Sequence, residues 1–380
     1  MSVRMGIIGV GGMGSLHAKT IQESVKGCEL VAVCDIKPKQ LEPLKHLKTF
    51  ADSRELIRSG LVEAVLIATP HYGHTTIGID ALEQGLHVLV EKPISVHKKD
   101  ARKLIAAHTD KNQVFAAMFN QRTDPHYIRI KRLIDAGELG EIQRVNWIIT
   151  SWFRSEAYYT SSDWRATWKG EGGGVLLNQS PHQLDLLQWM CGMPCRVRAF
   201  GSLGKYHDIE VEDEMTAYLE YPNGATGVFI TSTGEAPGTN RLEIAGDRGR
   251  IVVENWKVTF VRNEVPSGEF CKTTKGLFDM PERWNVEIPV EGWGEQHLGI
   301  IKNFIAAIAN GEPLIAPAEE GIHSVELANA MLYSALNDVT VDLPLDGEAF
   351  EAMLKRLIAE SRFEKKMGEQ EMGDLSKSFR

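Results

Sequence analysis

A short apolar run followed by closely spaced glycines restricts the fold of this chain more than any other feature. Residues 6–20 read GIIGVGGMGSLHAKT, and a second apolar run, LVAVCD at 30–35, ends on an aspartate. Glycines let the backbone approach a pyrophosphate, the following helix offers N–H groups to it, and a carboxylate accepts hydrogen bonds from ribose hydroxyls. A glycine-rich turn in an unrelated α/β protein is the alternative. The order predicts a dinucleotide site made by Gly9, Gly11, Gly12, Met13, Gly14 and Asp35.

The first third of the chain alternates between strand-like and helix-like segments. Five short runs are almost wholly apolar, and helix-like stretches such as 74–84 and 97–110 lie between them; the runs are RMGIIGV, ELVAVCD, AVLIATP, HVLVEKP and VFAAMFN. Strands of this kind are buried on both faces, as in a parallel sheet flanked by helices. We therefore predict an α/β fold in which residues 1–123 form a Rossmann dinucleotide-binding domain.

The pattern changes after Pro125. Several β-rich segments follow one another, separated by turn signals at 222–224 and 246–249, and helix patterns return at 295–310 and 320–336. This indicates a second α/β domain, residues 124–355, with an open, mainly antiparallel sheet. The charged stretch 356–380 is expected to be a tail that is mobile or lies on a neighbouring subunit.

Composition narrows the classes of partner and compartment. The formal charge of −9 argues against a nucleic-acid or anionic-membrane partner. The chain has no apolar run long enough to cross a membrane and no signal-peptide pattern at its start. Its five cysteines have no paired or zinc-like spacing, so we expect free thiols, a cytoplasmic location and no metal.

Polar residues follow three of the predicted parallel strands, at the sheet edge where ligands bind. Lys92 of EKP stands directly where an apolar strand stops, so its cation could stabilise an alkoxide or transfer a proton. The alternative is a solvated lysine paired with Glu91. We assign to cofactor binding Thr69, Pro70, His74, Glu91 and Lys92 itself.

A second group lies in EGGGVLLNQSPHQLDLLQW, residues 171–189. Ser180 as N-cap, Pro181 and Gln183 resemble a capping box at the start of a helix. His182 and Asp185 are three residues apart and would share a helix face, where the carboxylate could orient the ring as an acid/base group. A capping histidine and a salt-bridged aspartate are the alternatives.

A third group is rich in aromatic residues. Six of the 29 aromatic side chains fall within 152–168, beside Arg154, Arg165 and Lys169. Flat rings stack on sugar or cyclitol rings, although an oligomer interface would also enrich these residues. We expect the substrate to contact Lys92, Arg122, Trp152, Arg154, Tyr158, Trp164, Asn178, His182 and Asp185.

The motifs GVGGMG, ATPHYGH, EKP, FNQR, WR and GGGVLLNQSPHQLD, in this order, resemble the Gfo/Idh/MocA oxidoreductases over roughly residues 4–340. The resemblance implies that an N-terminal Rossmann domain carries NAD or NADP and that the second domain supplies the substrate site and the subunit interface. It also implies that Lys92 and His182 flank the reacting carbon, with His182 as proton acceptor and Arg165 close to cofactor and substrate. The family commonly has Asp where this chain has Asn178, which can only exchange hydrogen bonds.

These observations predict an NAD-dependent dehydrogenase that acts on a ring hydroxyl of a neutral sugar, glycoside or cyclitol. Asp35 favours NAD, although Lys37 and Lys39 keep NADP possible. An NAD-dependent glycosidase with transient oxidation, a sugar-nucleotide or uronate dehydrogenase, and a non-enzymatic dinucleotide-sensing regulator are the alternatives. We also expect a homodimer or homotetramer joined through the second sheet, with one apolar face made by Met215, Ala217, Leu219, Val228 and Ile230.

Overall fold

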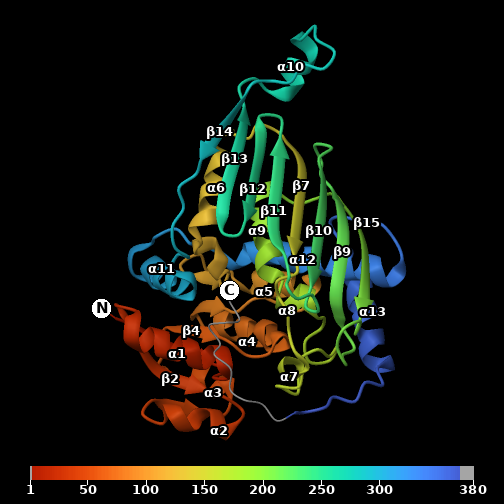
Figure 1. The fold of residues 1–380 in the computed structure, drawn as a ribbon. Coiled ribbons are helices and arrows are strands. Elements are labelled where there is room, and N and C mark those ends of the chain that lie inside the picture. Colours follow the sequence, from red (N-terminus) through yellow and green to blue (C-terminus); the bar gives the residue numbers. More distant parts are fainter. Residues whose placement is uncertain (1, 369–380) are drawn as a thin grey trace.

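The computed structural model describes residues 2–368, which contain two β-sheets (Figure 1). The first sheet has six parallel strands in the order β3-β2-β1-β4-β5-β6. They are β1 (Val3–Ile8), β2 (Cys28–Cys34), β3 (Lys48–Phe50), β4 (Ala64–Ile67), β5 (His87–Val90) and β6 (Phe115–Ala117). The predicted Rossmann-like parallel sheet is confirmed, and the short edge strand β3 is an addition to the expected set.

Helices cover both faces of this sheet, and for that reason its strands are almost wholly apolar. The helices of this part are α1 (Gly12–Ser24), α2 (Pro38–Leu41), η1 (Glu42–Leu44), α3 (Ser53–Ile57), α4 (His71–Glu83) and α5 (Lys98–Ala107). The chain also returns late in its length, because α11 (Gln296–Asn310) contributes Ile300, Ile301 and Phe304 to the same hydrophobic core. The domain boundary at residue 123 stays a prediction.

The second sheet has nine strands in the order β14-β13-β12-β11-β7-β10-β9-β8-β15. Only β7 and β10 pair in parallel, so the predicted mainly antiparallel sheet is confirmed. The strands are β7 (Ile142–Ile149), β8 (Arg196–Leu203), β9 (Glu212–Glu220), β10 (Thr226–Ser232), β11 (Asn240–Gly246), β12 (Gly249–Glu254), β13 (Lys257–Asn263), β14 (Arg283–Glu287) and β15 (Val341–Asp342).

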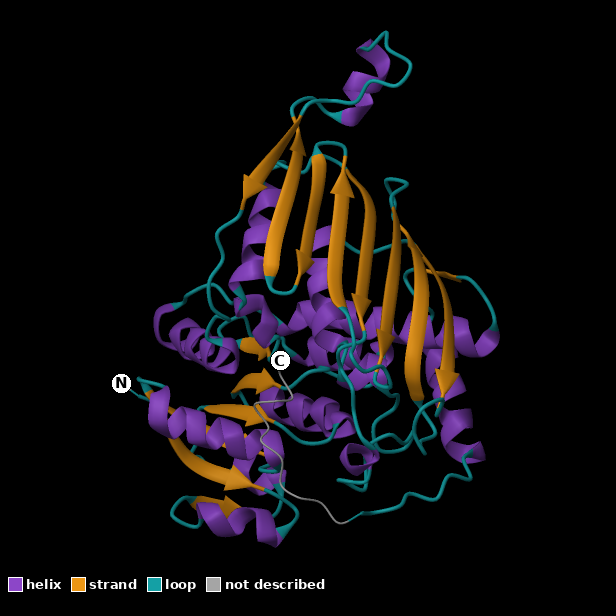
Figure 2. Ribbon diagram, viewed as in Figure 1, coloured by secondary structure: helices purple, strands orange, loops and turns teal. Residues whose placement is uncertain are grey.

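One face of the second sheet is covered by helices. Figure 2 shows them packed behind the sheet, with no described helix across its near face. α12 packs against β8 and α9. The helices of this part are η2 (Asn120–Thr123), α6 (Pro125–Asp135), α7 (Glu156–Tyr159), α8 (Val175–Asn178), α9 (Pro181–Cys191), α10 (Ser267–Thr273), η3 (Ala318–Glu320), α12 (Gly321–Asn337) and α13 (Gly347–Glu360). In residues 2–368 no helix is long and apolar enough to span a membrane.

The strand register corrects the apolar face expected on β9 and β10. Met215 and Leu219 are buried against the helices, whereas Val228 pairs with Tyr218 and Ile230 pairs with Thr216 on the opposite face. The hairpin register places these two apolar sets on opposite sides of the sheet. We call the uncovered side the bare face; it carries the side chains of Phe200, Tyr218, Val228, Ile230 and Ile148.

We expect this bare face to be covered by a second copy of the chain. Phe200 is 60% exposed and Tyr218 is 43% exposed, a costly arrangement on an open sheet. An Ile230→Glu variant should therefore lower the mass measured by light scattering at micromolar concentration from an oligomer toward the monomer. The control variant Leu61→Glu, on the first domain, should keep the oligomeric mass. A wild-type protein that is monomeric under these conditions would contradict the prediction.

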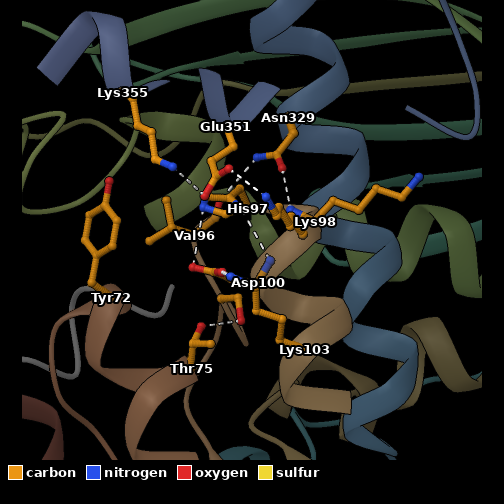
Figure 3. A network of polar contacts seen from close by, with 12 residues as sticks. Tyr72, Thr75, Val96, His97, Lys98, Asp100, Lys103, Asn329, Glu351 and Lys355 are labelled. Atoms are coloured by element: carbon orange, nitrogen blue, oxygen red, sulfur yellow. Dashed lines mark hydrogen bonds and ion pairs between the residues drawn. The ribbon is translucent and has the colours of Figure 1, made fainter. Parts of the chain in front are cut away.

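The two domains contact each other at the segment between β5 and α5. Figure 3 shows Asn329 of α12 beside Val96 and Lys98: its side-chain oxygen accepts from Lys98 N at 2.9 Å, and its nitrogen donates to Val96 O at 3.2 Å. The Lys98 ammonium is 2% exposed and lies 2.5 Å from Glu326 Oε1. These buried contacts fix the loop that begins with Glu91 and Lys92 relative to the second domain.

The segment that follows the last helix begins at residue 361. α13 continues to Glu360, so the predicted boundary at residue 356 falls inside a helix. The segment 361–368 lies on its own chain, because Lys365 Nζ donates to Tyr159 O at 2.7 Å and Lys366 pairs with Asp208 at 2.5 Å. The rest of the predicted tail, 369–380, lies outside the described residues.

Candidate active site

The glycine motif forms a tight turn between β1 and α1. Gly9 has φ +89°, and a Cβ there would lie 2.7 Å from Ala68 O. A Cβ on Gly14 would lie 1.8 Å from Gly9 O, whereas Gly11 has no atom within 4 Å of that position. Gly12 and Met13 begin α1, so their N–H groups lie at a helix start. Gly9 and Gly14 thus pack closely against backbone, whereas Gly11 leaves room for a pyrophosphate to approach the turn.

Asp35 follows β2 and is held beside this turn. Its Oδ2 accepts from Val10 N at 2.9 Å, and its Oδ1 accepts from Lys37 N at 2.8 Å. The Lys37 ammonium points to Asp163, 3.3 Å away. The carboxylate is therefore fixed where it can accept hydrogen bonds from a ribose, and these residues fit a dinucleotide.

The loops after β4 and β5 are tied together by His74. Its ring nitrogens lie 2.7 Å from Pro93 O and 2.8 Å from Thr69 O, and the side chain is 1% exposed. His74 therefore holds the two loops together, and its assignment as a cofactor contact stays a prediction. Thr69 and Pro70 do lie at the start of α4, and the buried Thr69 hydroxyl has no described hydrogen-bond partner.

Glu91 is paired with a histidine of the first helix. Its Oε1 lies 2.6 Å from His17 Nε2, and its Oε2 accepts from Lys92 N at 3.1 Å. Burial raises the pKa of Glu91, but the hydrogen bond and charge of His17 outweigh it and bring the pKa to about 2. Glu91 is thus a fixed anion beneath Lys92, not the surface partner of a solvated lysine.

Lys92 reaches from the first domain to the second. Its ammonium donates to the backbone oxygen of Asn178 at 2.6 Å, which brings the predicted EKP and NQSPH motifs together. Burial lowers the pKa of Lys92 to about 8, opposed first by the charge of Glu91. The side chain can therefore give up or recover a proton at mildly alkaline pH.

His182 lies on α9 close to Lys92. Its ring meets Phe119 edge-on at 6.4 Å between centroids, and its Nδ1 has no described hydrogen-bond partner. Burial and then the charge of Lys92 hold the pKa of His182 well below its usual range. The imidazole is neutral at physiological pH and can accept a proton.

The expected helix-start contacts around His182 differ from the structure. Ser180 is the N-cap residue, but its hydroxyl pairs with Thr231 at 2.9 Å and makes no capping bond. Gln183 donates to Gln121 Oε1 at 2.9 Å, so there is no capping box. Asp185 does not orient His182 either, because its carboxylate accepts hydrogen bonds from a different side chain.

That side chain is Arg122, and the two form a buried ion pair. Arg122 Nε and Nη2 donate to the two oxygens of Asp185 at 2.7 and 2.6 Å, and both side chains are 1% exposed. Arg122 Nη1 also reaches Glu320 at 2.5 Å. The buried pair links η2 to α9. The assignment of Arg122 and Asp185 to the substrate stays a prediction.

Some aromatic side chains of residues 152–168 lie in the hydrophobic core, and others lie at the candidate site. Trp152, Tyr159 and Trp168 belong to the hydrophobic core. The assignment of Trp152 to the substrate stays a prediction. Tyr158 and Trp164 are partly exposed, and the Arg165 guanidinium lies over both rings at 4.6 and 4.5 Å. Arg154 lies over Tyr158 at 5.1 Å. Fewer rings can therefore stack on a ligand than the sequence density suggested.

Three side chains of this region are not predicted from the sequence. His17 and His297 have rings 5.5 Å apart, and Glu171 is buried beside Asn178. Glu171 stands at the start of the quoted glycine run, so its position was a usable signal. His297 comes from α11, far along the chain, and only the fold brings it close to Lys92 and His182.

Comparison with known proteins agrees with this arrangement. Residues 3–119 match the model of the oxidoreductase family with an NAD-binding Rossmann fold, and residues 127–252 match the GFO/IDH/MocA C-terminal domain. Myo-inositol 2-dehydrogenase of Thermotoga maritima is 27% identical over 84% of this chain and 92% of its own. Levoglucosan dehydrogenase of Pseudarthrobacter phenanthrenivorans is 25% identical over 77% of this chain and 83% of its own.

A solved structure shows the same similarity. The WlbA dehydrogenase from Chromobacterium violaceum, in complex with NADH and UDP-GlcNAcA, is 25% identical and superposes with a TM-score of 0.78 over 91% of this chain and 97% of its own. Both domain models of one family thus match the two parts of this chain, in the order in which the structure places them. The chain belongs to the Gfo/Idh/MocA family and is an NAD-binding oxidoreductase.

Proposed function

We propose that this oxidoreductase transfers hydride between a ring hydroxyl or ketone of a sugar, glycoside or cyclitol and NAD, with Lys92 and His182 as its acid/base pair. The observation that carries the proposal is that the Lys92 ammonium of the first domain donates to the backbone oxygen of Asn178, just before α9, and that its charge lowers the pKa of His182 on α9. The named relatives act on an inositol and an anhydrosugar, which supports this substrate class.

The two residues have complementary tasks. The glycine turn would hold NAD, which would supply the hydride acceptor. The neutral His182 ring takes the hydroxyl proton, while the Lys92 ammonium stabilises the negative charge that develops on the oxygen. Tyr158 and the Asn178 side chain offer hydrogen-bonding groups to neighbouring hydroxyls, and Trp164 offers a ring face.

A sugar nucleotide or uronate is the second candidate substrate. Arg154 and Arg165 both lie over Tyr158, so two cations stand beside the site. The solved WlbA relative holds UDP-GlcNAcA, a compound of that class. A negative group on the substrate could pair with these guanidinium groups.

A substrate panel tests the proposal. Inositols, glycosides, free hexoses, sugar phosphates, uronates and sugar nucleotides are incubated with NAD at a pH just below the Lys92 pKa of about 8, and NADH formation is followed by absorbance. We expect a neutral ring compound to give NADH in proportion to the ketone formed. A preference for charged compounds would favour the second candidate, and aglycone release without net NADH would indicate the glycosidase reaction. If no compound gives turnover that depends on Lys92, the proposal is wrong.

NAD should be preferred over NADP. The carboxylate of Asp35 would repel a 2′-phosphate, and Lys37 is directed toward Asp163. We expect kcat/KM with NAD to exceed that with NADP by about tenfold or more, equivalent to roughly 1.4 kcal/mol. An Asp35→Ser variant should narrow the ratio, whereas Asp346→Ser, which alters the N-terminal cap of α13 in the second domain, should not. Equal or higher kcat/KM with NADP in the wild type would contradict the assignment.

A further inference from the structure

A buried carboxylate connects several groups of the proposed site. Glu171 lies between the aromatic segment and the glycine run, and it is 2% exposed. Its backbone N donates to Thr167 O at 2.8 Å, and its backbone O lies 3.2 Å from His71 Nδ1. These contacts hold the residue on both sides, so its carboxylate has a fixed position.

Each oxygen of this carboxylate accepts a hydrogen bond from a different part of the site. Oε2 accepts from Ala166 N at 2.6 Å, and Ala166, which follows Arg165, has φ +56°. Such a backbone conformation is unfavourable for alanine and needs support from its surroundings. Glu171 therefore secures the turn that presents Arg165 to Tyr158.

The other oxygen sets the orientation of Asn178. Oε1 accepts from the Asn178 side-chain nitrogen, so the side-chain oxygen of Asn178 faces Tyr158 OH at 3.1 Å. Tyr158 OH accepts in turn from Arg165 Nη1 at 2.8 Å. One carboxylate thus fixes the donors and acceptors along this wall of the site, and the backbone of the same asparagine accepts from Lys92.

Glu171 also contributes charge at Lys92. Burial lowers the pKa of Lys92, and Glu91 opposes that effect most. Arg165 and Arg154 lower the pKa further, and Glu171 is the second carboxylate that raises it. Glu91 is already bonded to His17, whereas both partners of the Glu171 carboxylate are uncharged amides. The titratable and charged groups that surround Lys92 on the packed elements are Glu91, Glu171, Arg154, Arg165, His71, His74, His182 and His297.

We propose that Glu171 is a positioning residue of the reaction: it orients Asn178 and Arg165 and keeps the proton on Lys92. The proposal rests on the proposed role of Lys92. It goes further in assigning the charge balance of the site to a carboxylate outside the EKP and NQSPH motifs. A purely structural carboxylate would hold the turn but leave the titration of Lys92 unchanged.

The test measures the titration of Lys92 directly. Competitive labelling with acetic anhydride across pH, read by mass spectrometry, gives the midpoint for Lys92 without substrate or NAD. Removing a nearby anion disfavours the ammonium, so Glu171→Gln should lower this midpoint by about one pH unit. Glu171→Ala is measured alongside, so that the result does not depend on the folding of one variant. The control Glu210→Gln also removes a carboxylate that accepts a backbone N–H, that of Trp168, and should leave the midpoint unchanged.

A charge-retaining variant separates the two tasks. Glu171→Asp keeps the anion but is too short to reach both Ala166 and Asn178, so the Lys92 midpoint should stay near the wild-type value while KM for the substrate rises severalfold. If neither Glu171→Gln nor Glu171→Ala moves the midpoint, or if Glu210→Gln moves it equally, the proposal is wrong. Because labelling needs no turnover, a failure of the proposed sugar oxidation would leave this result intact and readable.

Discussion

Replacement of His182 by alanine should lower kcat by roughly 10²- to 10⁴-fold, the usual contribution of a general acid–base group. His182 is 7% exposed, and burial with the nearby Lys92 charge keeps its ring neutral. The proton of the substrate hydroxyl would then have no acceptor. The affinity for NAD, measured by fluorescence titration, should stay close to the wild-type value, because the glycine turn and Asp35 lie on other elements.

Lys92→Ala should give a loss of similar size, and the wild type should show an alkaline limb in kcat/KM near pH 8, where Lys92 loses its proton. Lys92 titrates as a base, so activity that needs the ammonium is present below its pKa and falls above it. His46→Ala, whose ring lies 2.8 Å from Gln22 on the surface, is the control and should retain kcat. Near-normal kcat in a folded His182 or Lys92 variant, as judged by its Tm, would remove that residue from the acid/base pair.

Asp185→Ala should be the most destabilising single substitution considered, at about 3–5 kcal/mol of unfolding free energy. The change leaves the guanidinium of Arg122 buried and deprived of its two hydrogen bonds to this carboxylate. Glu320, which is 44% exposed, remains as a partner on one side only. Denaturant unfolding gives the free energy, provided that the variant unfolds in one transition.

The surface pair Arg58–Asp80 is the matched control for this prediction. It is also bidentate, through Arg58 Nη1 and Nη2 at 2.8 and 2.6 Å, but the Arg58 side chain is 47% exposed. Asp80→Ala should therefore cost about 1 kcal/mol or less. The double variant Arg122→Met/Asp185→Leu should recover much of the stability lost in Asp185→Ala. If Asp185→Ala and Asp80→Ala lower the free energy of unfolding equally, burial does not determine how much the Arg122–Asp185 pair contributes to stability.

Much of the fold and part of the site could be predicted from local patterns. Gly9, Gly14 and Asp35 depend on a strand–turn–helix order that lies within a few dozen residues, and the structure keeps that order. The apolar runs and turn signals likewise located most strands of both sheets. These features are decided by neighbours in sequence, so sequence alone contains them.

The rest depends on which surfaces meet in three dimensions. Helical spacing places His182 and Asp185 near each other, but it does not show that Arg122 from another element reaches Asp185 first. Strand alternation gives two faces, but only the pairing of Tyr218 with Val228 shows which side each apolar residue occupies. Aromatic density likewise does not separate the core Trp152 from the partly exposed Trp164.

The late return of the chain to the first sheet restricts how such a protein can be recombined. Ile301 and Phe304 of α11, together with Ala316 and Val325, complete the core around the parallel strands. A chimaera that exchanged only residues 1–123 between two relatives would join unmatched halves of this core. An exchange that also carried residues 296–325 would keep the packing partners together. The core of the cofactor-binding domain is thus encoded by two separate segments of the sequence. A domain exchange between relatives therefore has to transfer both segments together.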